Sequence, residues 1–420
     1  MIFIKSLSIY TTTSIINAAI PFLLLPVLTS YLSTEEFGLL AMIQIFITFT
    51  IPFISINIHS TMELQYHHLS QEEFASWVSS VLFIPIITFW GILFMFIVLE
   101  SLIYNFINAS LIWILVIPLI AFMQIVPQTI LSIYKISQRA IEYGKYQLTL
   151  TAVNLFLTLV LIVLFNLGWQ GRVLAILLTF ILFTLFGIYL LMKMKLIASK
   201  IEWLYVKQAL QIGAPLILHV ISGALFMMSD RLFVSYYLGN SELGIYAVAT
   251  QVAMIAFIIQ QSFNQAWVPY LFQNLKIGLM VNKVKIVKIS YIAILFFAIL
   301  PFLIELINPF IFRFFIDKKF INALPYVFWI ALGYSFLGMY KVVTNYIFYE
   351  KRVGLLSGMT FFSLIVNLIL NYMLIHQYGA IGVAYGTVIT IAMFFVIAFI
   401  IANRVHSMPW LYFIKGGKAI

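Results

Sequence analysis

Two copies of one polar motif stand almost half a chain apart. The first reads YLSTEEFGLLA from Tyr31 and the second reads YLGNSELGIYA from Tyr237, at a constant offset of 206 in a chain of 420 residues. Each copy lies between two long apolar segments, which predicts a short polar turn between two membrane helices. A duplicated set of membrane helices is typical of transporters, so this repeat limits the possible folds strongly. The identical pairs are Tyr31 and Tyr237, Leu32 and Leu238, Glu36 and Glu242, Gly38 and Gly244, and Ala41 and Ala247.

The composition is that of a helical membrane protein. Hydrophobic residues make up 64% of the chain and charged residues 9%. The apolar residues fall in runs long enough to cross a hydrocarbon core about 30 Å thick. The chain has no cysteine, which excludes disulfides, thiol catalysis and thiolate metal sites. No spacing of histidines with carboxylates indicates a metal site, and we expect no cofactor.

We predict an all-α integral membrane protein with twelve transmembrane helices in two six-helix lobes. No connection between the predicted spans is long enough for a soluble domain. The spans cover residues 6–32, 37–62, 77–99, 111–134, 146–167, 173–191, 209–238, 243–270, 289–307, 323–349, 355–376 and 381–402.

The distribution of basic residues predicts the topology. Segments on the side of the N-terminus hold 18 of the 23 Lys and Arg residues, and loops rich in these residues stay in the cytoplasm. Both termini are therefore expected to be cytoplasmic. Because the basic residues are spread over several loops, the net charge of +10 does not indicate a nucleic-acid partner. One predicted cytoplasmic loop, 63–73, has no Lys or Arg.

A second repeat supports the two-lobe organisation. The triplet Val-Asn-Leu at 153–155 recurs at 366–368, and Gly168 and Gly171 recur in the same order as Gly379 and Gly382. Six helices per half is an even number, so the two halves are predicted to be parallel repeats. We predict an N-terminal lobe at 1–192, a basic cytoplasmic linker at 193–208, a C-terminal lobe at 209–403 and a cytoplasmic tail at 404–420.

Charged residues within the predicted spans are the first candidates for a site, because ionisable groups at membrane depth are costly. Lys341 stands ten residues before Lys351, which places it near the middle of the membrane. Asp230 and Arg231 lie inside the outer end of the seventh span. Adjacent helical positions point about 100° apart, so these two side chains are not expected to neutralise each other directly. Each could line a cavity or pair with a neighbouring helix.

Amide side chains within the spans form a second group of candidates. Gln124 and Gln128 are four residues apart, as are Gln260 and Asn264, so each pair shares one helix face. Polar groups would be unsatisfied against lipid, and we expect them to face the interior. There they line a wet cavity or form hydrogen bonds between helices. Two further amides of this group are Asn367 and Asn371.

Two histidines are weaker candidates. His219 lies deep in the seventh span and His59 lies near the inner end of the second. A lone membrane histidine is more often a hydrogen-bonded core residue than a proton-coupling group. Both residues stay in the candidate set with these two explanations open.

Several segments carry a family resemblance. They are PVLTSYLSTEEFG at 26–38, GAP at 213–215, SDR at 229–231, the second polar motif from Tyr237, and Asn367, Asn371, Gly379 and Gly382. Together they resemble the polysaccharide transporters, the O-antigen flippase branch of the multidrug/oligosaccharidyl-lipid/polysaccharide exporter (MOP) superfamily. The resemblance extends over essentially the whole chain.

The resemblance implies a function. Members of this family are bacterial inner-membrane proteins that move undecaprenyl-pyrophosphate-linked oligosaccharides to the periplasmic face, so this chain is expected to flip O-antigen repeat units by alternating access. Arg231 and Lys341 would bind the pyrophosphate, the Asn and Gln side chains would bind the sugar, and the isoprenoid tail would stay among the membrane lipids. A coupling ion, H+ or Na+, and an O-antigen polymerase are further expected partners.

Three alternatives stay open. Cation-coupled multidrug exporters of the same superfamily need a buried carboxylate, and the first six predicted spans have no Asp or Glu away from their ends. Lipid II flippases resemble a fourteen-helix design, whereas twelve spans are predicted here. A membrane polysaccharide polymerase or glycosyltransferase needs a long outer loop or a pair of acids, and the sequence offers neither. The sequence therefore favours a transporter without catalytic residues.

Overall fold

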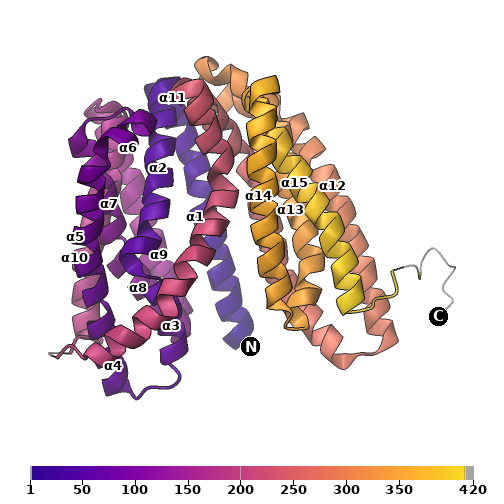
Figure 1. Cartoon of the computed structure of the whole chain (residues 1–420), viewed down its shortest axis with the longest axis horizontal. Helices are drawn as coiled ribbons and strands as arrows, with labels where there is room; N and C mark the ends of the chain where they lie inside the picture. The colour runs from indigo at the N-terminus through magenta and orange to yellow at the C-terminus, as the bar shows by residue number, and fades with distance from the viewer. Residues whose placement is uncertain (1, 199, 411, 413–420) are drawn as a thin grey trace. The chain divides into compact units, whose positions relative to one another are not determined.

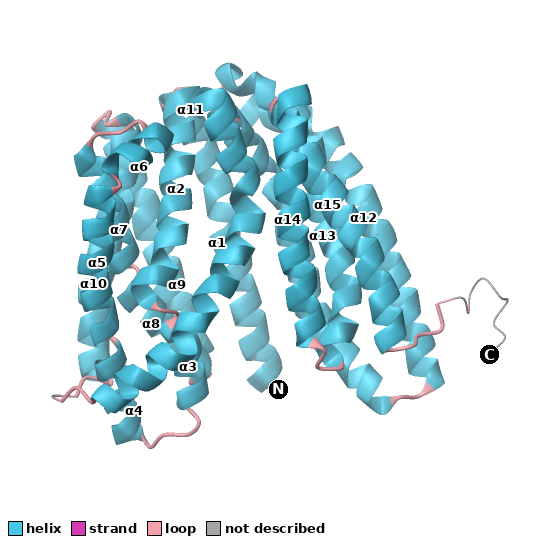
Figure 2. Ribbon diagram, in the orientation of Figure 1, coloured by secondary structure: helices cyan, strands magenta, loops and turns pink. Residues whose placement is uncertain are grey.

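The computed structural model describes residues 2–198, 200–410 and 412. These residues form helices joined by short turns, and no strand occurs among them (Figure 2). The all-α fold class is confirmed.

The helices of the first half begin with α1 at the N-terminus and end before residue 194 (Figure 1). They are α1 (Ile2–Tyr31), α2 (Thr34–Ser55), α3 (Ile58–Gln65), α4 (Gln71–Val81), α5 (Phe83–Val98), α6 (Glu100–Ile107), α7 (Leu111–Met123), α8 (Ile125–Ile136), α9 (Ala140–Leu159), a π-helical extension η1 (Val160–Leu164) and α10 (Gly168–Lys193). The short helix α6 lies between the third and fourth predicted spans, where no helix is predicted.

The helices of the second half are fewer and longer. They are α11 (Trp203–Ile277), α12 (Met280–Phe315), a 3-10 turn η2 (Lys318–Ala323), α13 (Leu324–Tyr349), α14 (Val353–Tyr378) and α15 (Ala380–Val405).

The helices cover all twelve predicted spans. Ten helices in the described part of the chain are long and apolar enough to cross a membrane. One of them is the 75-residue α11, which turns at Gly239, where φ is 85° and ψ is 173°. Its two arms therefore account for the seventh and eighth spans, and α1 accounts for the first. The predicted twelve-helix design is confirmed on this basis.

Prolines explain why two predicted spans are each built from two helices. A proline has no N–H, so the carbonyl four residues earlier loses its helical partner. α4 ends at Val81, four residues before Pro85, and α7 ends at Met123, four residues before Pro127. The Thr184 hydroxyl donates a hydrogen bond of 2.6 Å to the Met123 carbonyl oxygen, which satisfies the freed acceptor.

The second predicted span is interrupted for a different reason. Ile56 and Asn57 both have left-handed backbones, with φ of 47° and 52°, and they separate α2 from α3. Gly213 of α11 lies directly against the Ile56 carbonyl oxygen, so that an added Cβ would overlap it. The Thr88 hydroxyl donates at 2.6 Å to the Ile54 carbonyl oxygen. The interruption is therefore held in place by packing from two other helices.

The chain divides into two compact units. Unit 1 comprises residues 1–228 with 239–244, and unit 2 comprises 229–238 with 245–420. Within unit 1, α1 packs against α9, and α2 packs against α5 and α7. Within unit 2, α13 packs against α12 and α15. The lobes at 1–192 and 209–403, with their linker and tail, stay a prediction.

The two copies of the polar motif contact each other inside unit 1. Gly38 lies against the Asn240 carbonyl oxygen and Gly244 lies against the Thr34 carbonyl oxygen, each so closely that a Cβ would overlap. Thr34 and Ser241 also share a hydrogen bond of 2.8 Å between their hydroxyls. Because Gly38 and Gly244 are equivalent in the repeat, as are Thr34 and Asn240, the contact is reciprocal.

The second repeat also plays the same structural part twice. Gly168 and Gly379 both have positive φ, 56° and 67°, which a residue with a side chain adopts only with strain. Three residues later, Gly171 and Gly382 each allow close approach to a carbonyl oxygen, that of Leu161 in the first half and that of Leu374 in the second. The duplicated glycines thus preserve one helix-to-helix connection in both halves.

Candidate functional site

Most of the predicted site residues lie in unit 2. They are Asp230, Arg231, Gln260 and Asn264 on α11, Lys341 on α13, and Asn367 and Asn371 on α14. His59, Gln124, Gln128 and His219 lie in unit 1. Within unit 2 the polar residues form two groups, one around the cations and one around the asparagines of α14.

Lys341 is half-buried between helices and has neutral partners. Its Nζ donates to the Gln261 Oε1 atom at 2.7 Å and lies 5.8 Å from the centre of the Phe257 ring. An aromatic face attracts a cation without cancelling its charge. No salt bridge to Lys341 occurs in the described part of the chain. This lysine therefore carries a net positive charge into the interior of unit 2.

Further amides lie near Lys341 on the facing sides of α11 and α13. The Asn345 amide donates to Asn264 Oδ1 at 2.9 Å and to the Lys341 carbonyl oxygen at 2.7 Å. Gln260 is fully buried, and both of its amide atoms lack a hydrogen-bond partner among the described residues. Gly338 brings the helices together here, since an added Cβ would lie 3.0 Å from the Gln260 Cβ. Unsatisfied buried amides of this kind are uncommon and indicate a place for a polar ligand or water.

Arg231 and Asp230 point to different partners, as their helical positions require. Asp230 is 9% exposed, and its carboxylate accepts hydrogen bonds from the Tyr246 hydroxyl at 2.9 Å and from the Arg231 backbone N–H at 2.8 Å. The Arg231 guanidinium instead lies near the Tyr334 hydroxyl. The two charged side chains form no salt bridge within 4.0 Å, so the guanidinium keeps donors for another anion.

Two aromatic rings connect the cations. Phe257 and Tyr334 meet with their ring centres 5.4 Å apart. Lys341 lies over Phe257, and Arg231 lies near Tyr334, so the two cations flank one aromatic pair. Tyr334 and Lys341 are two helical turns apart on one face of α13. The arrangement suits a ligand with two or more negative charges.

The second group surrounds the asparagines of α14. The Ser229 hydroxyl donates to Asn367 Oδ1 at 2.7 Å, and the Asn371 amide donates to the same oxygen at 3.1 Å. Asn367 in turn donates to the Thr387 hydroxyl at 3.3 Å. Asn367 and Asn371 are both 0% exposed. The network gathers several oxygen atoms in a dry setting.

One oxygen of this network is not satisfied. Asn371 Oδ1 is buried without a hydrogen-bond partner in the described part of the chain. Gly386 of α15 leaves the space beside it, since an added Cβ would lie 2.6 Å from that oxygen. A buried acceptor without a donor is costly, which suggests that a cation or a donor occupies this position in some state of the protein.

The candidates of unit 1 do not form a comparable group. The His59 ring lies 3.3 Å from the Ile125 carbonyl oxygen and 3.4 Å from the Thr129 hydroxyl, which is the hydrogen-bonded core role. Gln124, at the junction of α7 and α8, and Gln128 are half-buried, and His219 is exposed. No hydrogen bond joins these side chains to one another among the described residues.

Arg172 falls between the fifth and sixth predicted spans, which end at residue 167 and begin at residue 173. α10 begins at Gly168, earlier than the predicted start at residue 173, so Arg172 belongs to the helix. Its guanidinium donates to Asn154 Oδ1 at 2.7 Å and to the Thr158 hydroxyl at 2.6 Å. Asn154 is the counterpart of Asn367 in the second repeat. This match is the sequence signal that indicates a polar contact in unit 1 as well.

Metal ligands are not grouped. Among the described residues no cluster of three or more His, Cys, Asp or Glu side chains could hold a metal ion. The predicted site residues of unit 2 are instead two cations, one carboxylate and four neutral amides.

Comparison with known sequences identifies a family. A model described as polysaccharide biosynthesis protein matches residues 3–275, and a MatE model matches residues 215–373. An uncharacterized membrane protein of Haemophilus influenzae is 28% identical over 378 residues, covering 88% of this chain and 89% of the relative. Lsg locus putative protein 1 of the same organism is 23% identical and covers 86% of this chain and 88% of the relative.

Comparison with solved structures shows the fold. A multidrug resistance MATE family transporter of the MOP superfamily, in its inward-facing conformation, has a TM-score of 0.69 at 14% identity and covers 92% of this chain and 94% of its own. The lipid II flippase MurJ in an inward closed conformation has a TM-score of 0.65 at 15% identity, with 98% and 89% covered.

Proposed function

Because this chain belongs to the polysaccharide biosynthesis protein family, we propose that it flips lipid-linked oligosaccharides, specifically undecaprenyl-pyrophosphate-linked O-antigen repeat units. The cargo would pass from the cytoplasmic to the periplasmic leaflet of a bacterial inner membrane by alternating access. Both termini would lie in the cytoplasm, as the distribution of basic residues predicts.

The pair of cations in unit 2 is the observation that carries the proposal. Arg231 and Lys341 flank one aromatic pair, and neither forms a salt bridge among the described residues. Lys341 donates to the Gln261 amide, and Arg231 lies near the Tyr334 hydroxyl and the Asp230 carboxylate. A buried cation is costly unless an anion compensates it for part of the working cycle. A pyrophosphate supplies that compensation and then leaves with its lipid.

The amides near these cations suit the sugar of the same cargo. Gln260 has unsatisfied buried donors and acceptors, and Asn264 and Asn345 lie one to two turns from Lys341 along the facing helices. Sugar hydroxyls both donate and accept hydrogen bonds, as amides do. Recognition of neutral sugars by amides and of the pyrophosphate by cations would divide the work between two kinds of side chain.

For the coupling ion we infer a site at the asparagine network of α14. The two halves of the chain use equivalent asparagines differently. In unit 1, Arg172 follows Gly171 and donates to Asn154. In unit 2, the residue after Gly382 is Val383, so the cluster around Asn367 has no resident guanidinium at the equivalent position. A monovalent cation bound by Asn371 Oδ1 and its neighbours would take that place, and oxygen ligands suit Na+.

Sodium should therefore stabilise the purified protein, and Asn371→Leu should abolish this effect. A ligand at 100 times its dissociation constant adds about 2.7 kcal/mol, or roughly 5 °C in Tm for a chain of this size. The measurement is Tm in sodium chloride against N-methylglucamine chloride at equal ionic strength. Gln377→Leu, an exposed amide on the same helix, is the matched control. Equal Tm values in both salts for the unmodified protein would point to H+ as the ion instead.

Deletion of the gene in its own organism tests the flippase proposal against the multidrug alternative. Surface O-antigen should be almost completely lost, while lipid-linked repeat units accumulate in the cytoplasmic leaflet. Susceptibility to cationic drugs should not change. Normal surface polysaccharide together with increased drug susceptibility would instead favour the multidrug exporter.

A further inference from the structure

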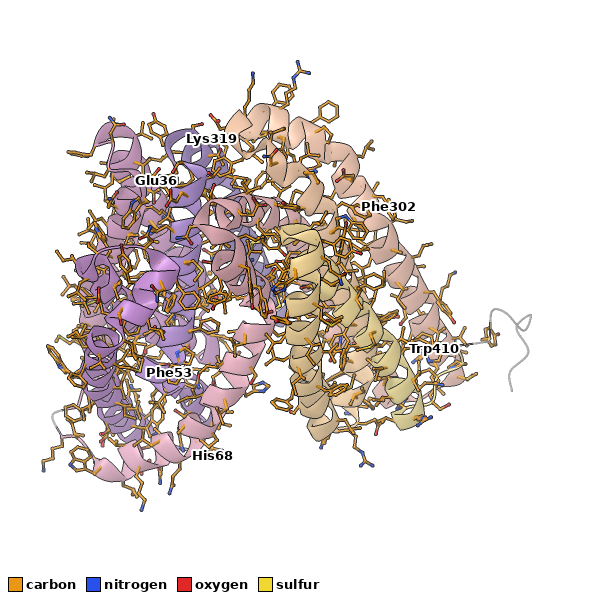
Figure 3. All side chains as sticks on the ribbon, turned by 45° about the horizontal axis from the view of Figure 1, so that its top comes forward. Glu36, Phe53, His68, Phe302, Lys319 and Trp410 are labelled. Atoms are coloured by element: carbon orange, nitrogen blue, oxygen red, sulfur yellow. The ribbon has the colours of Figure 1, made fainter. Side chains whose placement is uncertain are left out.

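Unit 1 contains a cavity that has no part in the proposed transport site. Its volume is about 740 Å³, and it lies where the α3–α4 turn, the α8–α9 turn and the end of α10 meet. None of the predicted site residues lines it. In Figure 3 the label of His68, on the α3–α4 turn, marks this end of unit 1, and Glu36 marks the opposite end.

The floor of the cavity is apolar and its rim is charged. Phe74, Ile133 and Leu196 line it and are between 3% and 6% exposed. Arg139, Glu142 and Lys193 line it as exposed residues. An apolar pocket beneath a charged rim matches an amphiphilic ligand, whose charged group would stay near water.

The wall formed by the segment after α10 is held in place. The Ala198 N–H donates a hydrogen bond of 2.7 Å to the Ser79 hydroxyl. The same hydroxyl donates a hydrogen bond of 3.3 Å to the Leu196 carbonyl oxygen. A little further along, the Glu202 N–H donates to the Ser80 hydroxyl at 2.9 Å. These bonds tie the segment to α4, so the cavity is formed without a ligand and little ordering is needed on binding.

The rim carries an excess of positive charge. Arg139 and Lys193 form no side-chain hydrogen bond or salt bridge within the described ranges, whereas Lys135 close by is paired with Glu63 at 3.0 Å. Glu142 lies in the first turn of α9, where the helix dipole favours a carboxylate. Two cations against one carboxylate leave a net charge that favours an anion.

We propose that this cavity binds an anionic phospholipid, with the phosphate between Arg139 and Lys193 and the upper acyl chains over the apolar floor. Basic pockets between membrane helices on the cytoplasmic side are recognised sites for acidic lipid headgroups. The distribution of basic residues along the chain predicts that this end of unit 1 faces the cytoplasm. Exposed apolar side chains next to the rim, Ile141 at 51% and Met192 at 60%, extend the surface along which the acyl chains lie.

The test is lipid binding by the purified full-length protein in a neutral detergent. Phosphatidylglycerol should raise the Tm and bind measurably in a titration, and phosphatidylcholine should do neither. Each basic residue near an anionic headgroup contributes roughly fivefold in affinity. The double variant Arg139→Gln with Lys193→Gln should therefore bind phosphatidylglycerol about 25-fold more weakly, and Glu142→Gln should bind it more tightly.

Controls separate lipid binding from folding and from a soluble anion. Lys285→Gln, an exposed basic residue of unit 2, should bind phosphatidylglycerol like the unmodified protein. If the double glutamine variant does not fold, Arg139→Lys with Lys193→Arg keeps both charges and should retain binding. The proposal is overturned if phosphatidylcholine binds as well as phosphatidylglycerol. It is also overturned if the Arg139→Gln, Lys193→Gln double variant or the Glu142→Gln variant binds phosphatidylglycerol with unchanged affinity. Full competition by inorganic pyrophosphate at equal concentration would overturn it as well.

Discussion

Gly244→Ala should lower the Tm of the purified protein by about 2–6 °C, and Gly38→Ala should do the same. Each added methyl would overlap a backbone carbonyl oxygen of the other copy of the motif, and a backbone atom cannot rotate away as a flexible side chain can. Overpacking of this kind costs about 1–3 kcal/mol or more. Because the contact is reciprocal, the two variants should have similar effects. The Tm is measured by thermal unfolding in which the folded protein that remains at each temperature is quantified by size-exclusion chromatography.

Two other helical glycines provide matched controls. An added Cβ at Gly91 or at Gly223 would meet no atom within 4 Å. Alanine has a higher helix propensity than glycine by up to about 1 kcal/mol, so Gly91→Ala and Gly223→Ala should leave the Tm unchanged or raise it. If Gly38→Ala and Gly244→Ala behaved like these controls, the two copies of the motif would not cross as closely as the structure indicates.

Much of the fold could be predicted from the sequence, because the membrane imposes length and apolarity on every span. The twelve apolar runs and the two repeats were sufficient for the helix count and for the turns at Gly239 and Gly379. Proline alone does not predict the breaks before Pro85 and Pro127, because Pro52, Pro118 and Pro301 lie inside unbroken helices. The break at Ile56 could not be predicted either, because it depends on Gly213, which is distant in sequence and packs against it.

A helix-capping signal explains the predicted inner loop without basic residues. Ser70 and Glu73 form a capping box at the start of α4, where the Glu73 N–H donates to the serine hydroxyl and the Ser70 N–H donates to the glutamate. The same S-x-x-E pattern occurs at Ser33 and Glu36, at the start of α2. Glu72 and Glu73 therefore serve the N-terminus of α4, whereas Glu63 pairs with Lys135, and the capping motif can be recognised from sequence.

The sequence predicts the charges of the candidate site and the amides Gln260, Asn264, Asn367 and Asn371, but not the residues that contact them. Lys341 and Arg231 stand out because ionisable residues are rare in membrane spans. Their partners do not stand out, because Gln261 and Tyr334 are ordinary residues whose role depends on which helix faces meet. The predicted sixth span begins at residue 173, whereas α10 begins at Gly168 and includes Arg172. The residue therefore belongs to a helix and contacts Asn154, which its position between two predicted spans does not indicate.

Lys341→Gln should reduce flipping by about 30-fold or more while the protein folds normally. Glutamine can still reach toward Gln261, but it removes the positive charge that the pyrophosphate requires. A hydrogen bond to a charged group contributes about 2–3 kcal/mol, which corresponds to roughly 30- to 150-fold in binding. Lys341→Arg keeps the charge and should retain most of the activity. The measurement is surface O-antigen relative to protein abundance in a deletion strain that expresses each variant.

Arg231→Gln should have an effect of similar size, and the combination with Lys341→Gln decides whether the two cations act on one ligand. If both bind the same pyrophosphate, the double variant should lose less than the product of the two single losses, since the second charge has little left to bind once the first is gone. Lys351→Gln, an exposed basic residue beyond the end of α13, controls for the general effect of lost charge and should leave flipping unchanged. Full activity of the double variant would exclude these cations from substrate recognition. If the loss of flipping in the double variant equals the product of the two single losses, Arg231 and Lys341 act in separate steps of the cycle.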